Sequence, residues 1–333
     1  MKAVAYAIEI CLLALLAPVV RAFRFLGWRS RGVAIMGWWG SETRGDIAIL
    51  GQLLEESRQV APDAPVTVAS FDTAITGRTL RDLEASGVSL VAVGIGSAWK
   101  IAAARCVVIG GGPLMESPSM VAWAWSVRLA RIAGARALCY ANGIGPVRTA
   151  RTAQAVTALT RAATHVVLRD DASVKWLAAQ DQRIHVTVAF DPAFDFVRNR
   201  VGGMVPRRRG QLALALRTPP ASYLGELDAG RATEAFLDLV ASALNLLART
   251  HAVPLIGVVM HDGSGDSDDH AVYARLRTRL ARPELLTVRP GHHTVDDAVR
   301  DIAESRAALT VRFHAMIFAL AAGTPFVAVD YAR

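Results

Sequence analysis

The feature that most constrains the fold is a recurring order of three parts: a short apolar run, a glycine- or aspartate-rich turn, and a helix-forming stretch. The first copy consists of an apolar run at residues 32–36, a glycine-rich turn at residues 37–46, and residues 47–60 with Leu50 and Leu53 on one helical face. Continuous apolar runs are typical of strands buried on both faces of a parallel sheet, whereas helical spacing indicates an amphipathic helix. The repetition of this order predicts an α/β fold with doubly wound parallel sheets.

The chain has 333 residues, enough for two domains of ordinary size. We predict an apolar, basic N-terminal segment at residues 1–31, a Rossmann-like domain at residues 32–197, a linker at residues 198–210 and a second Rossmann-like domain at residues 211–333. The linker is inferred from composition, because RNRVGGMVPRRRG is polar, basic and rich in glycine.

The N-terminal segment has two interpretations. Residues 3–20 are apolar apart from Glu9, and four arginines follow between residues 21 and 31. Cleavage as a secretory signal is not expected, because such signals carry their positive charge before the apolar core. Glu9 also interrupts the stretch of about 20 apolar residues that a membrane span requires. The segment is therefore either an interfacial anchor with its arginines on the cytoplasmic side, or a helix packed on the protein's own surface.

The charge and the cysteines limit the classes of partner. The net charge is +8, but only three of the 37 basic residues are lysines, and no basic run is interleaved with aromatic residues. We therefore predict no nucleic-acid partner; an anionic substrate or an anionic membrane face explains the charge equally well. Cys11, Cys106 and Cys139 have no metal-like spacing and are expected to be buried, reduced thiols in the cytoplasm. No metal or cofactor is predicted, although the acidic loop with Asp262 and Asp266 leaves a cation as an alternative.

The C-terminal stretch, residues 309–330, contains the strongest candidate site. A β-branched run ends at Arg312, His314 follows, and a helix without breakers extends to Gly323. Ligands of open α/β sheets bind where strands end, and a helix N-terminus offers N–H groups to an anion. The pattern therefore predicts a site for a phosphorylated or carboxylated small molecule. The alternative is that Arg312 pairs with a carboxylate and His314 is a core histidine.

Other predicted strands also end in turns suited to a ligand. The candidate residues in these turns are Gly40, Gly45, Asp46, Gly111, Gly112, Asn142, Gly143, Arg169, Asp191 and, in the second domain, Arg217. Asp46 opens a predicted helix and is most simply explained as its N-cap. Trp38, Trp39 and Tyr140 are suited to stacking on a sugar ring, and packing explains them equally well.

Several segments in a fixed order resemble the polysaccharide pyruvyl transferase family. They are GWWGSETRGDIAIL, VVIGGGPL, NGIGPV, LRDDASVKWL, the pair Asp191–Pro192, and VRFHAMIFALAAGTPFVAVDY, and they extend from about residue 32 to the C-terminus. The resemblance implies a GT-B-like pair of Rossmann-type domains. It also implies transfer of pyruvate from phosphoenolpyruvate, as a ketal, to two hydroxyls of a sugar in a cell-surface glycan or its lipid-linked precursor.

The chain departs from the family pattern in two places. Arg44 and Ile47 stand where the family usually has an asparagine and an acidic residue, so the acceptor contacts of this loop are not carried over. The relatives also continue with further helix after the last strand, so the chain is either short by nature or a fragment.

The chemistry implied by the resemblance assigns roles to the candidate residues. Arg312 and Arg217 would bind the carboxylate and phosphate of phosphoenolpyruvate, which is a co-substrate and the only small molecule besides the sugar. His314 would deliver a proton to the enol CH2, with Asp46 or Asp191 as base. The expected location is the cytoplasm, at the inner face of the cell membrane through residues 1–31. The alternatives are a GT-B glycosyltransferase that uses a nucleotide sugar, and a catalytically inactive relative.

Overall fold

The computed structural model describes residues 2–26, 31–203, 210–218, 229–263 and 268–329. The chain divides into two compact units. Unit 1 comprises Met1–Ser41 and Ile49–Pro192, and unit 2 comprises Glu42–Ala48 and Ala193–Arg333. The short segment 42–48 therefore groups with the C-terminal half of the chain, although it lies within the N-terminal half of the sequence.

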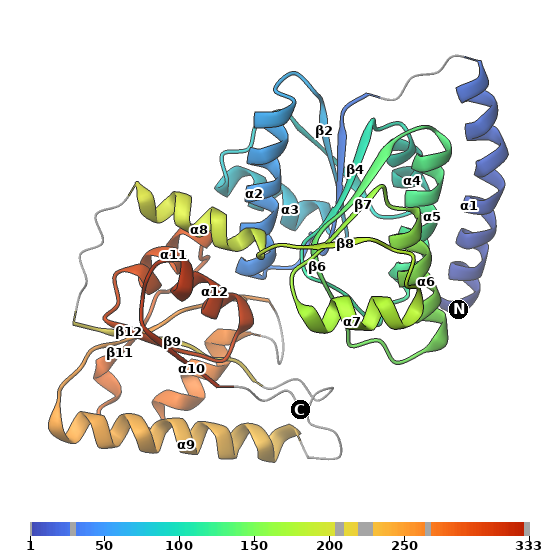
Figure 1. Ribbon diagram of the computed structural model, residues 1–333. Coiled ribbons are helices and arrows are strands. Elements are labelled where there is room, and N and C mark those ends of the chain that lie inside the picture. Colours follow the sequence, from blue (N-terminus) through green and yellow to red (C-terminus); the bar gives the residue numbers. More distant parts are fainter. Residues whose placement is uncertain (1, 27–30, 204–209, 219–228, 264–267, 330–333) are drawn as a thin grey trace. The chain divides into compact units, whose positions relative to one another are not determined.

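Unit 1 contains a parallel sheet with helices on its faces (Figure 1). Its strands are β1 (Val33–Met36), β2 (Val66–Ser70), β3 (Val88–Ala92), β4 (Cys106–Gly110), β5 (Pro113–Leu114), β6 (Arg136–Ile144), β7 (His165–Leu168) and β8 (Val186–Val188). The order is β3-β2-β1-β4-β6-β7-β8, and the short β5 pairs with β6. Since β2 and β4 flank β1, the strand order reverses between β1 and β4, which is where open α/β sheets bind ligands.

The helices of unit 1 are α1 (Lys2–Phe25), α2 (Arg44–Val60, whose first residues belong to unit 2), α3 (Thr73–Asp82), α4 (Ile95–Ala102), α5 (Ser119–Ile132), α6 (Ala150–Ala162) and α7 (Asp171–Gln180). One core combines Trp123 of α5 and Leu159 of α6 with Val107 of β4 and Cys139 of β6. Val107 and Cys139 point to the same face of the sheet, because alternate strand residues point to opposite faces. Helices α5 and α6 cover that face with Trp123 and Leu159.

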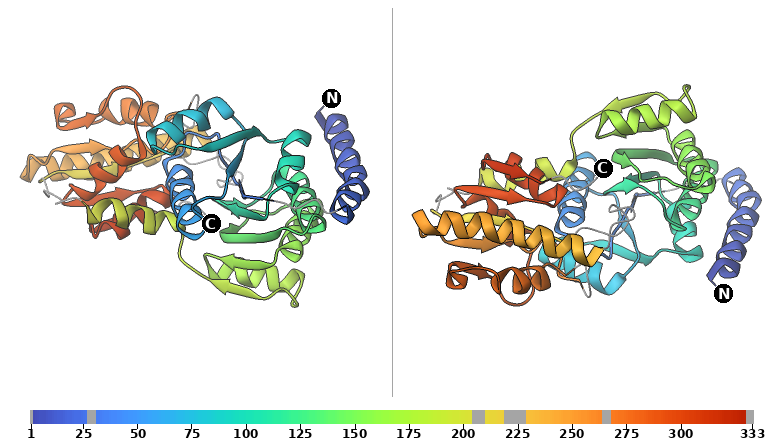
Figure 2. Two further views of the ribbon diagram at one scale, coloured as in Figure 1. Left: turned by 90° about the horizontal axis from the view of Figure 1, so that it is seen from above. Right: turned by 90° about the horizontal axis from the view of Figure 1, so that it is seen from below.

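Helix α1 packs on the outside of α5 and α4, and the views in Figures 1 and 2 agree on this arrangement. Val20 is 1% exposed in a cluster with Ala98, Ala122 and Leu129. Phe23 contacts Trp99 edge-on, with 5.7 Å between ring centroids. Helix α1 is therefore packed on the protein's own surface, which is the second interpretation of the N-terminal segment. No helix in the described residues is long and apolar enough to cross a membrane.

Unit 2 has a second parallel sheet of order β11-β10-β9-β12-β13. Its strands are β9 (Leu212–Ala215), β10 (Leu255–Gly257), β11 (Leu286–Val288), β12 (Ala307–Thr310) and β13 (Phe326–Ala328), and its helices are α8 (Pro192–Gly202), α9 (Ala229–Thr250), α10 (Asp269–Arg277), η3 (Pro283–Leu285), α11 (Val295–Ala303) and α12 (Phe313–Ala321). Thr294 and Asp297 have the three-residue spacing of a capping box in the sequence, and they cap α11 reciprocally in the structure.

Some local predictions were wrong. Helix α2 begins at Arg44, so Asp46 lies in the first turn and is not the N-cap. Strand β6 extends to Ile144, so Asn142 and Gly143 belong to the strand and not to a turn after it; pairing of Pro113 and Leu114 with its end supports the extension. Of the three cysteines expected to be buried, Cys11 is exposed and Cys106 is only half-buried; all three are unbonded. The segment expected as a linker begins inside α8, and residues 204–209 lie outside the described residues.

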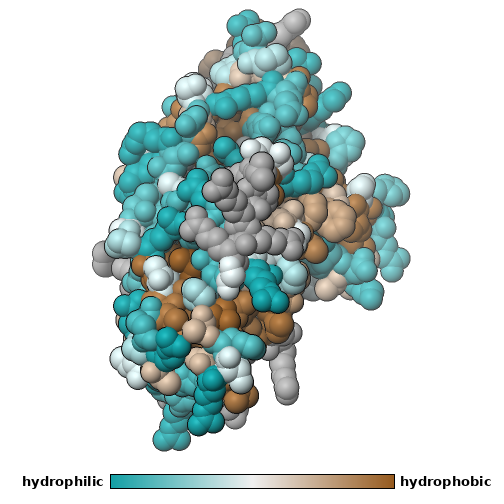
Figure 3. All heavy atoms as spheres, turned by 90° about the vertical axis from the view of Figure 1, so that its left-hand side faces the viewer, coloured by the Kyte–Doolittle hydropathy of each residue, from teal (hydrophilic) through white to brown (hydrophobic). Residues whose placement is uncertain are grey.

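Exposed apolar side chains are scattered over several elements, among them Leu239 and Leu246 of α9 and Leu320 of α12. Figure 3 shows one face of the molecule, on which hydrophilic residues predominate and apolar residues are interspersed. This mixture is ordinary for a folded protein, because polar surface never covers a protein completely.

Candidate functional site

The candidate site of unit 2 lies at the carboxyl ends of three adjacent strands. Arg217 follows β9, His261 follows β10, and Arg312 follows β12. Strand β9 pairs with β10 on one side and with β12 on the other, so the strand order reverses here. Parallel strands present their carboxyl ends at one edge of the sheet, and three cationic or titratable side chains are therefore gathered at the topological switch point.

Arg312 is held by Asp269, the first residue of α10. The Nε of Arg312 donates to Oδ1 of Asp269 at 3.1 Å, and Nη2 donates to the same oxygen. The other oxygen of Asp269 accepts from the backbone N–H groups of Met260 and His261, both at 2.9 Å. Asp269 is completely buried, so this pair fixes the guanidinium in one orientation relative to the end of β10. The pairing is the one that the alternative interpretation of Arg312 predicted.

Arg44 forms a second buried pair, with Asp262. Its Nη2 donates to Oδ2 of Asp262, its Nη1 donates to the carbonyl of Glu42 at 2.8 Å, and its side chain is completely buried. The backbone N–H of Arg44 also donates to the carbonyl of Met260 at 2.8 Å. Burial opposes ionisation of Asp262, but the charge and hydrogen bond of Arg44 outweigh it, so the pKa of Asp262 is lowered. Segment 42–48 is attached to unit 2 largely by these contacts.

Gly45 lies directly against His314. A Cβ added to Gly45 would be 2.0 Å from Cγ and 2.1 Å from Nδ1 of the imidazole, so only glycine permits this approach. His314 is half-buried in the first turn of α12, and Gly45 is in the first turn of α2. The predicted residues Gly45 and His314, 269 positions apart in sequence, are therefore in contact, and Asp46 is the next residue of the same turn.

The pKa of His261 is affected by most of the charged residues of this group. Burial lowers its pKa to about 4, and the charges of Arg312, Arg44 and Arg217 act in the same direction against the opposing charge of Asp262. Its Nδ1 accepts from the backbone N–H of Gly263 at 3.1 Å. A neutral ring with Nδ1 as acceptor carries its proton on Nε2. His261 is thus a neutral side chain beside three guanidinium groups, of which Arg44 is paired with Asp262 and Arg312 with Asp269.

Unit 1 contains a separate group of predicted residues near the carboxyl ends of β4, β6 and β7. Arg169 donates from Nη1 to Oδ2 of Asp191 at 2.6 Å, and both side chains are largely buried. The guanidinium also lies beside Gly143, where a Cβ would be 3.0 Å from Nε. Asn142 donates from Nδ2 to the carbonyl of Gly112 at 3.2 Å. The structure therefore brings Gly112, Asn142, Gly143, Arg169 and Asp191 together.

Two other turns need glycine because their backbones pack closely against the indole of Trp39. A Cβ on Gly37 or on Gly111 would lie within 2.4 Å of the Trp39 indole, and Gly111 has φ +80°. Gly40, with φ +99°, packs on Asp72 after β2 and is not part of the Arg169 group. Trp38 stacks on Phe71 and donates to the carbonyl of Pro113 at 2.9 Å. Both tryptophans are thus explained by packing.

Sequence reasoning missed four members of the unit 2 group: Arg44, His261, Asp262 and Asp269. Arg44 stood out only as a departure from the family pattern, and Asp262 only as part of an acidic loop. The available signal for His261 and Asp262 was their position directly after the apolar run at residues 253–260. A pairing across 218 positions, as in Arg44 and Asp262, leaves no local pattern. Asp266 lies outside the described residues, within which no group of three metal-ligating side chains is found.

The comparisons with known proteins agree with this fold and extend it to a family. The family model for polysaccharide pyruvyl transferases matches residues 44–333. A search of curated protein sequences finds no match.

Among solved structures, UDP-GlcNAc 2-epimerase from Methanocaldococcus jannaschii has a TM-score of 0.60 at 9% identity, covering 89% of this chain and 82% of that one. Anabaena HepE in complex with UDP-glucose has a TM-score of 0.56 at 13% identity, covering 89% of this chain and 80% of that one. UDP-GlcNAc 2-epimerase from Neisseria meningitidis bound to UDP-GlcNAc has a TM-score of 0.55 at 10% identity, covering 88% and 80%. These similarities confirm the predicted fold class, α/β with GT-B-like, Rossmann-type parallel sheets.

Proposed function

The chain belongs to the polysaccharide pyruvyl transferase family, and from this premise we propose that it transfers pyruvate from phosphoenolpyruvate, as a ketal, to a sugar of a cell-surface glycan or of its lipid-linked precursor. The observation that carries the proposal is the group at the strand ends of unit 2. There Arg217 and Arg312 follow the adjacent strands β9 and β12, and the charges of Arg44, Arg217 and Arg312 all reach His261. Phosphoenolpyruvate carries a phosphate and a carboxylate, and it needs several fixed cations for its binding.

We assign the donor to Arg217 and Arg312, because guanidinium groups bind carboxylate and phosphate in a bidentate manner. Asp269 orients Arg312 through Nε and Nη2. The neutral His261, whose Nε2 carries a proton, adds a hydrogen-bond donor without adding charge. Arg44 would act on the donor only through its charge and not through direct contact, because its side chain is fully buried against Asp262.

The reaction is assigned to His314 as acid. His314 transfers a proton to the CH2 carbon of the enol, and a sugar hydroxyl adds to C2 with loss of its own proton. The bond between C2 and the phosphate oxygen then breaks, and inorganic phosphate leaves. The second hydroxyl adds to C2 to close the ketal, and its proton passes to the departing phosphate. The products are the pyruvylated sugar and phosphate, so no oxidant or reductant is consumed.

Asp46 is the better candidate for the base of this reaction. It follows Gly45, which contacts His314, and both residues belong to unit 2. Asp191 belongs to unit 1 and is paired with Arg169.

We assign the unit 1 group with Gly111, Gly112, Asn142 and Gly143 to binding of the sugar acceptor. The proposed location is the cytoplasmic face of the membrane, in keeping with the unbonded cysteines.

A second candidate is a glycosyltransferase that uses a nucleotide sugar. Two of the structures with a similar fold were solved with UDP-glucose or UDP-GlcNAc, and this observation favours it. A catalytically inactive relative is the third candidate, because Arg44 replaces an asparagine usual in the family.

Thermal unfolding of the full chain with each ligand separates these candidates. A ligand that binds the folded state raises the midpoint once its concentration exceeds Kd. We expect a rise with phosphoenolpyruvate that is lost in Arg312→Ala and kept in Arg306→Ala, which removes an exposed arginine of the same unit. A rise with UDP-sugars alone would favour the second candidate.

Turnover is tested by phosphate release from phosphoenolpyruvate in the presence of sugar acceptors. Loss of the general acid in His314→Ala should slow release by about 10²–10⁴-fold. Full activity of both His314→Ala and Arg312→Ala would refute the assignment. Binding of phosphoenolpyruvate without release across a broad acceptor panel would support the inactive relative.

A further inference from the structure

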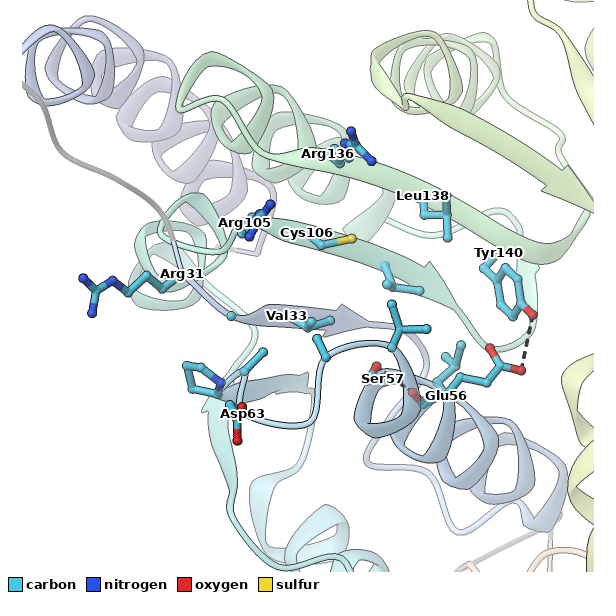
Figure 4. Close-up of a pocket in the computed structure, with 17 residues that line it drawn as sticks. Arg31, Val33, Glu56, Ser57, Asp63, Arg105, Cys106, Arg136, Leu138 and Tyr140 are labelled. Atoms are coloured by element: carbon cyan, nitrogen blue, oxygen red, sulfur yellow. Dashed lines mark hydrogen bonds between the residues drawn. The ribbon is translucent and has the colours of Figure 1, made fainter.

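A cavity of about 730 Å³ lies on the sheet of unit 1, on the face opposite the α5 and α6 core. It is lined by the C-terminal half of α2 and by β1, β4 and β6 (Figure 4). Its volume falls in the range of about 300–1,000 Å³ that is typical of small-ligand sites. None of the site residues assigned above lines it.

The walls of this cavity are apolar. They include Val33, Leu53, Val60, Val108 and Leu138. Leu138 and Cys106 are only half-buried, whereas their neighbours Ala137 and Val107 on the other face of the sheet are completely buried. Parallel sheets normally have both faces covered, so this apolar face, half-exposed among the described residues, is suited to an apolar ligand.

One end of the cavity is cationic. Arg31, Arg105 and Arg136 lie at the amino ends of β1, β4 and β6, which Figure 4 shows at the same end of the cavity. The strand register explains this, because Val33 is opposite Cys106 and Cys106 is opposite Arg136. Asp63 is an acidic residue at this end. The three guanidinium groups make no hydrogen bond or ion pair with another residue in the described part of the chain.

The other end of the cavity carries a polar contact. The hydroxyl of Tyr140 donates to Oε1 of Glu56 at 3.3 Å, and the dashed line in Figure 4 marks this bond. The cavity thus has apolar walls, with three arginines at one end and the contact between Tyr140 and Glu56 at the other. This shape fits a molecule with one long apolar part and one anionic end.

The same edge of unit 1 carries exposed apolar residues. Phe25 and Leu26, at the end of α1, are 92% and 79% exposed. Arg24 donates to the carbonyl of Ile132 at 3.0 Å and covers Gly134, two residues before Arg136. The end of α1 therefore lies beside the start of β6. Basic residues mixed with exposed aromatic and aliphatic side chains are typical of surfaces that meet an anionic bilayer.

We propose that this cavity binds one hydrocarbon chain of an anionic membrane phospholipid, whose headgroup is held by Arg31, Arg105 and Arg136. The exposed Phe25 and Leu26 favour a lipid that stays in a bilayer over a free amphiphile. The site is at the amino edge of the sheet, whereas the residues assigned to the sugar are near the carboxyl ends of the strands. Lipid binding is therefore independent of the proposed transferase activity.

Cys106 provides a reporter for occupancy, because it lines the cavity beside Arg136. Alkylation is measured in Cys11→Ser, which removes the exposed thiol; Cys139 is buried, and burial raises its pKa to about 12. We expect short-chain phosphatidylglycerol to slow alkylation of Cys106 by about tenfold or more, as a ligand at ten times its Kd would. The same length of phosphatidylcholine should protect less. Leu138→Trp should abolish protection by filling the cavity, and the matched change Leu246→Trp, on an exposed helix face, should preserve it.

The membrane source is tested by flotation of the full chain with vesicles. Vesicles with phosphatidylglycerol should bind it, and Arg31→Gln, Arg105→Gln and Arg136→Gln together should weaken binding by about 100-fold, since each basic residue near an anionic surface contributes about 1 kcal/mol. The control removes the same charge elsewhere, through the exposed Arg81, Arg249 and Arg306. Circular dichroism and thermal unfolding verify that each variant is folded.

Three results would overturn the proposal. The first is unchanged alkylation of Cys106 at saturating short-chain phosphatidylglycerol. The second is an equal loss of vesicle binding in the control triple variant, which would mean non-specific charge attraction. The third is protection by the soluble lipid without binding to vesicles, which would identify a free amphiphile and not a bilayer as the ligand. A lack of transferase activity would leave each of these measurements interpretable.

Discussion

At the scale of single residues, the departure from the family pattern at position 44 is a buried ion pair between Arg44 and Asp262. The asparagine usual at position 44 is neutral, whereas Arg44 brings a charge into the interior. The structure compensates it with a carboxylate from the loop after β10. Because Nε of Arg44 is buried without a hydrogen-bond partner in the described residues, the pair is only partly satisfied. Such pairs make little net contribution when intact but are costly to break.

Asp262→Asn should therefore destabilise the protein by about 3–5 kcal/mol, because it leaves a buried guanidinium without its counter-charge. The double variant Arg44→Met/Asp262→Leu should recover most of this loss. Denaturant unfolding measures both. Glu284→Gln is the control: it removes the carboxylate of an exposed pair with Arg282 and should leave the free energy of unfolding nearly unchanged. A cost for Asp262→Asn as small as that of the control would contradict the prediction.

The lowered pKa of His261 leads us to expect that the stability of the protein depends on pH. Its pKa is lowered from 6.5 to about 4 in the folded protein, mainly by burial. As the pH falls below 6.5, the unfolded chain gains a proton that the folded chain does not, so stability declines progressively until about pH 4. The pKa of His293 is lowered too, so it acts in the same direction.

We expect the unfolding midpoint of His261→Gln to fall less than that of the natural chain between about pH 7.5 and 5. His251→Gln, a change at an exposed histidine of unit 2, should behave like the natural chain. Equal pH dependence of all three proteins would show that the protonation of His261 is not linked to folding.

At the scale of secondary-structure elements, the contact between the first turns of α2 and α12 organises the candidate site. These turns bring Gly45 against His314 and provide two helix N-termini, which favour anions. Tyr273 supports the strands beneath them: its hydroxyl accepts from the N–H of Leu216 at 3.2 Å and donates toward the carbonyl of Val258 at 2.8 Å. The elements thus hold the strand ends that carry Arg217 and His261.

Gly45→Ala tests this contact. The added methyl overlaps the imidazole of His314, so we expect destabilisation by about 1–3 kcal/mol and displacement of the ring. The measurements are thermal unfolding and the His314 ring signals in NMR. Gly202→Ala serves as the control, because a Cβ there meets nothing within 4 Å. Unchanged stability together with unchanged His314 signals would show that the two turns are not in contact.

At the scale of the whole molecule, the two units are alike in plan, but only unit 1 is extended by α1. The inner face of α1 buries Val20 with Leu129 of α5, and its C-terminal end borders the edge of unit 1 that carries the arginines of the proposed lipid site. The helix is therefore part of the fold of unit 1 as well as a candidate for membrane contact.

Val20→Asp should release α1, since it places an unpaired carboxylate in an apolar cluster, at a cost above about 2 kcal/mol. Limited proteolysis should then cleave between α1 and β1 more quickly. The neighbouring Val19→Asp is the control, because Val19 is 42% exposed and its substitution should change stability by no more than about 0.5 kcal/mol. Equal proteolysis of both variants would mean that the Val20 contact does not hold α1.

The sequence by itself determined the α/β class, the capped start of α11, and the positions of Arg217, Arg312 and His314 after strands β9 and β12. These features follow from local rules: burial of continuous apolar runs, capping by Thr294, and the chemistry of a strand-to-helix junction. The family pattern added the expectation for phosphoenolpyruvate, which stays a prediction.

Only the tertiary structure decided which of these residues meet. Arg44 and Asp262 are 218 positions apart, and Arg312 and Asp269 are 43 apart, so no local pattern reveals either pair. The attachment of segment 42–48 to unit 2, the extension of β6 through Asn142, and the cavity beside Cys106 have the same origin. Each depends on surfaces that become neighbours only when distant segments pack, because burial and charge pairing act through space and not along the chain.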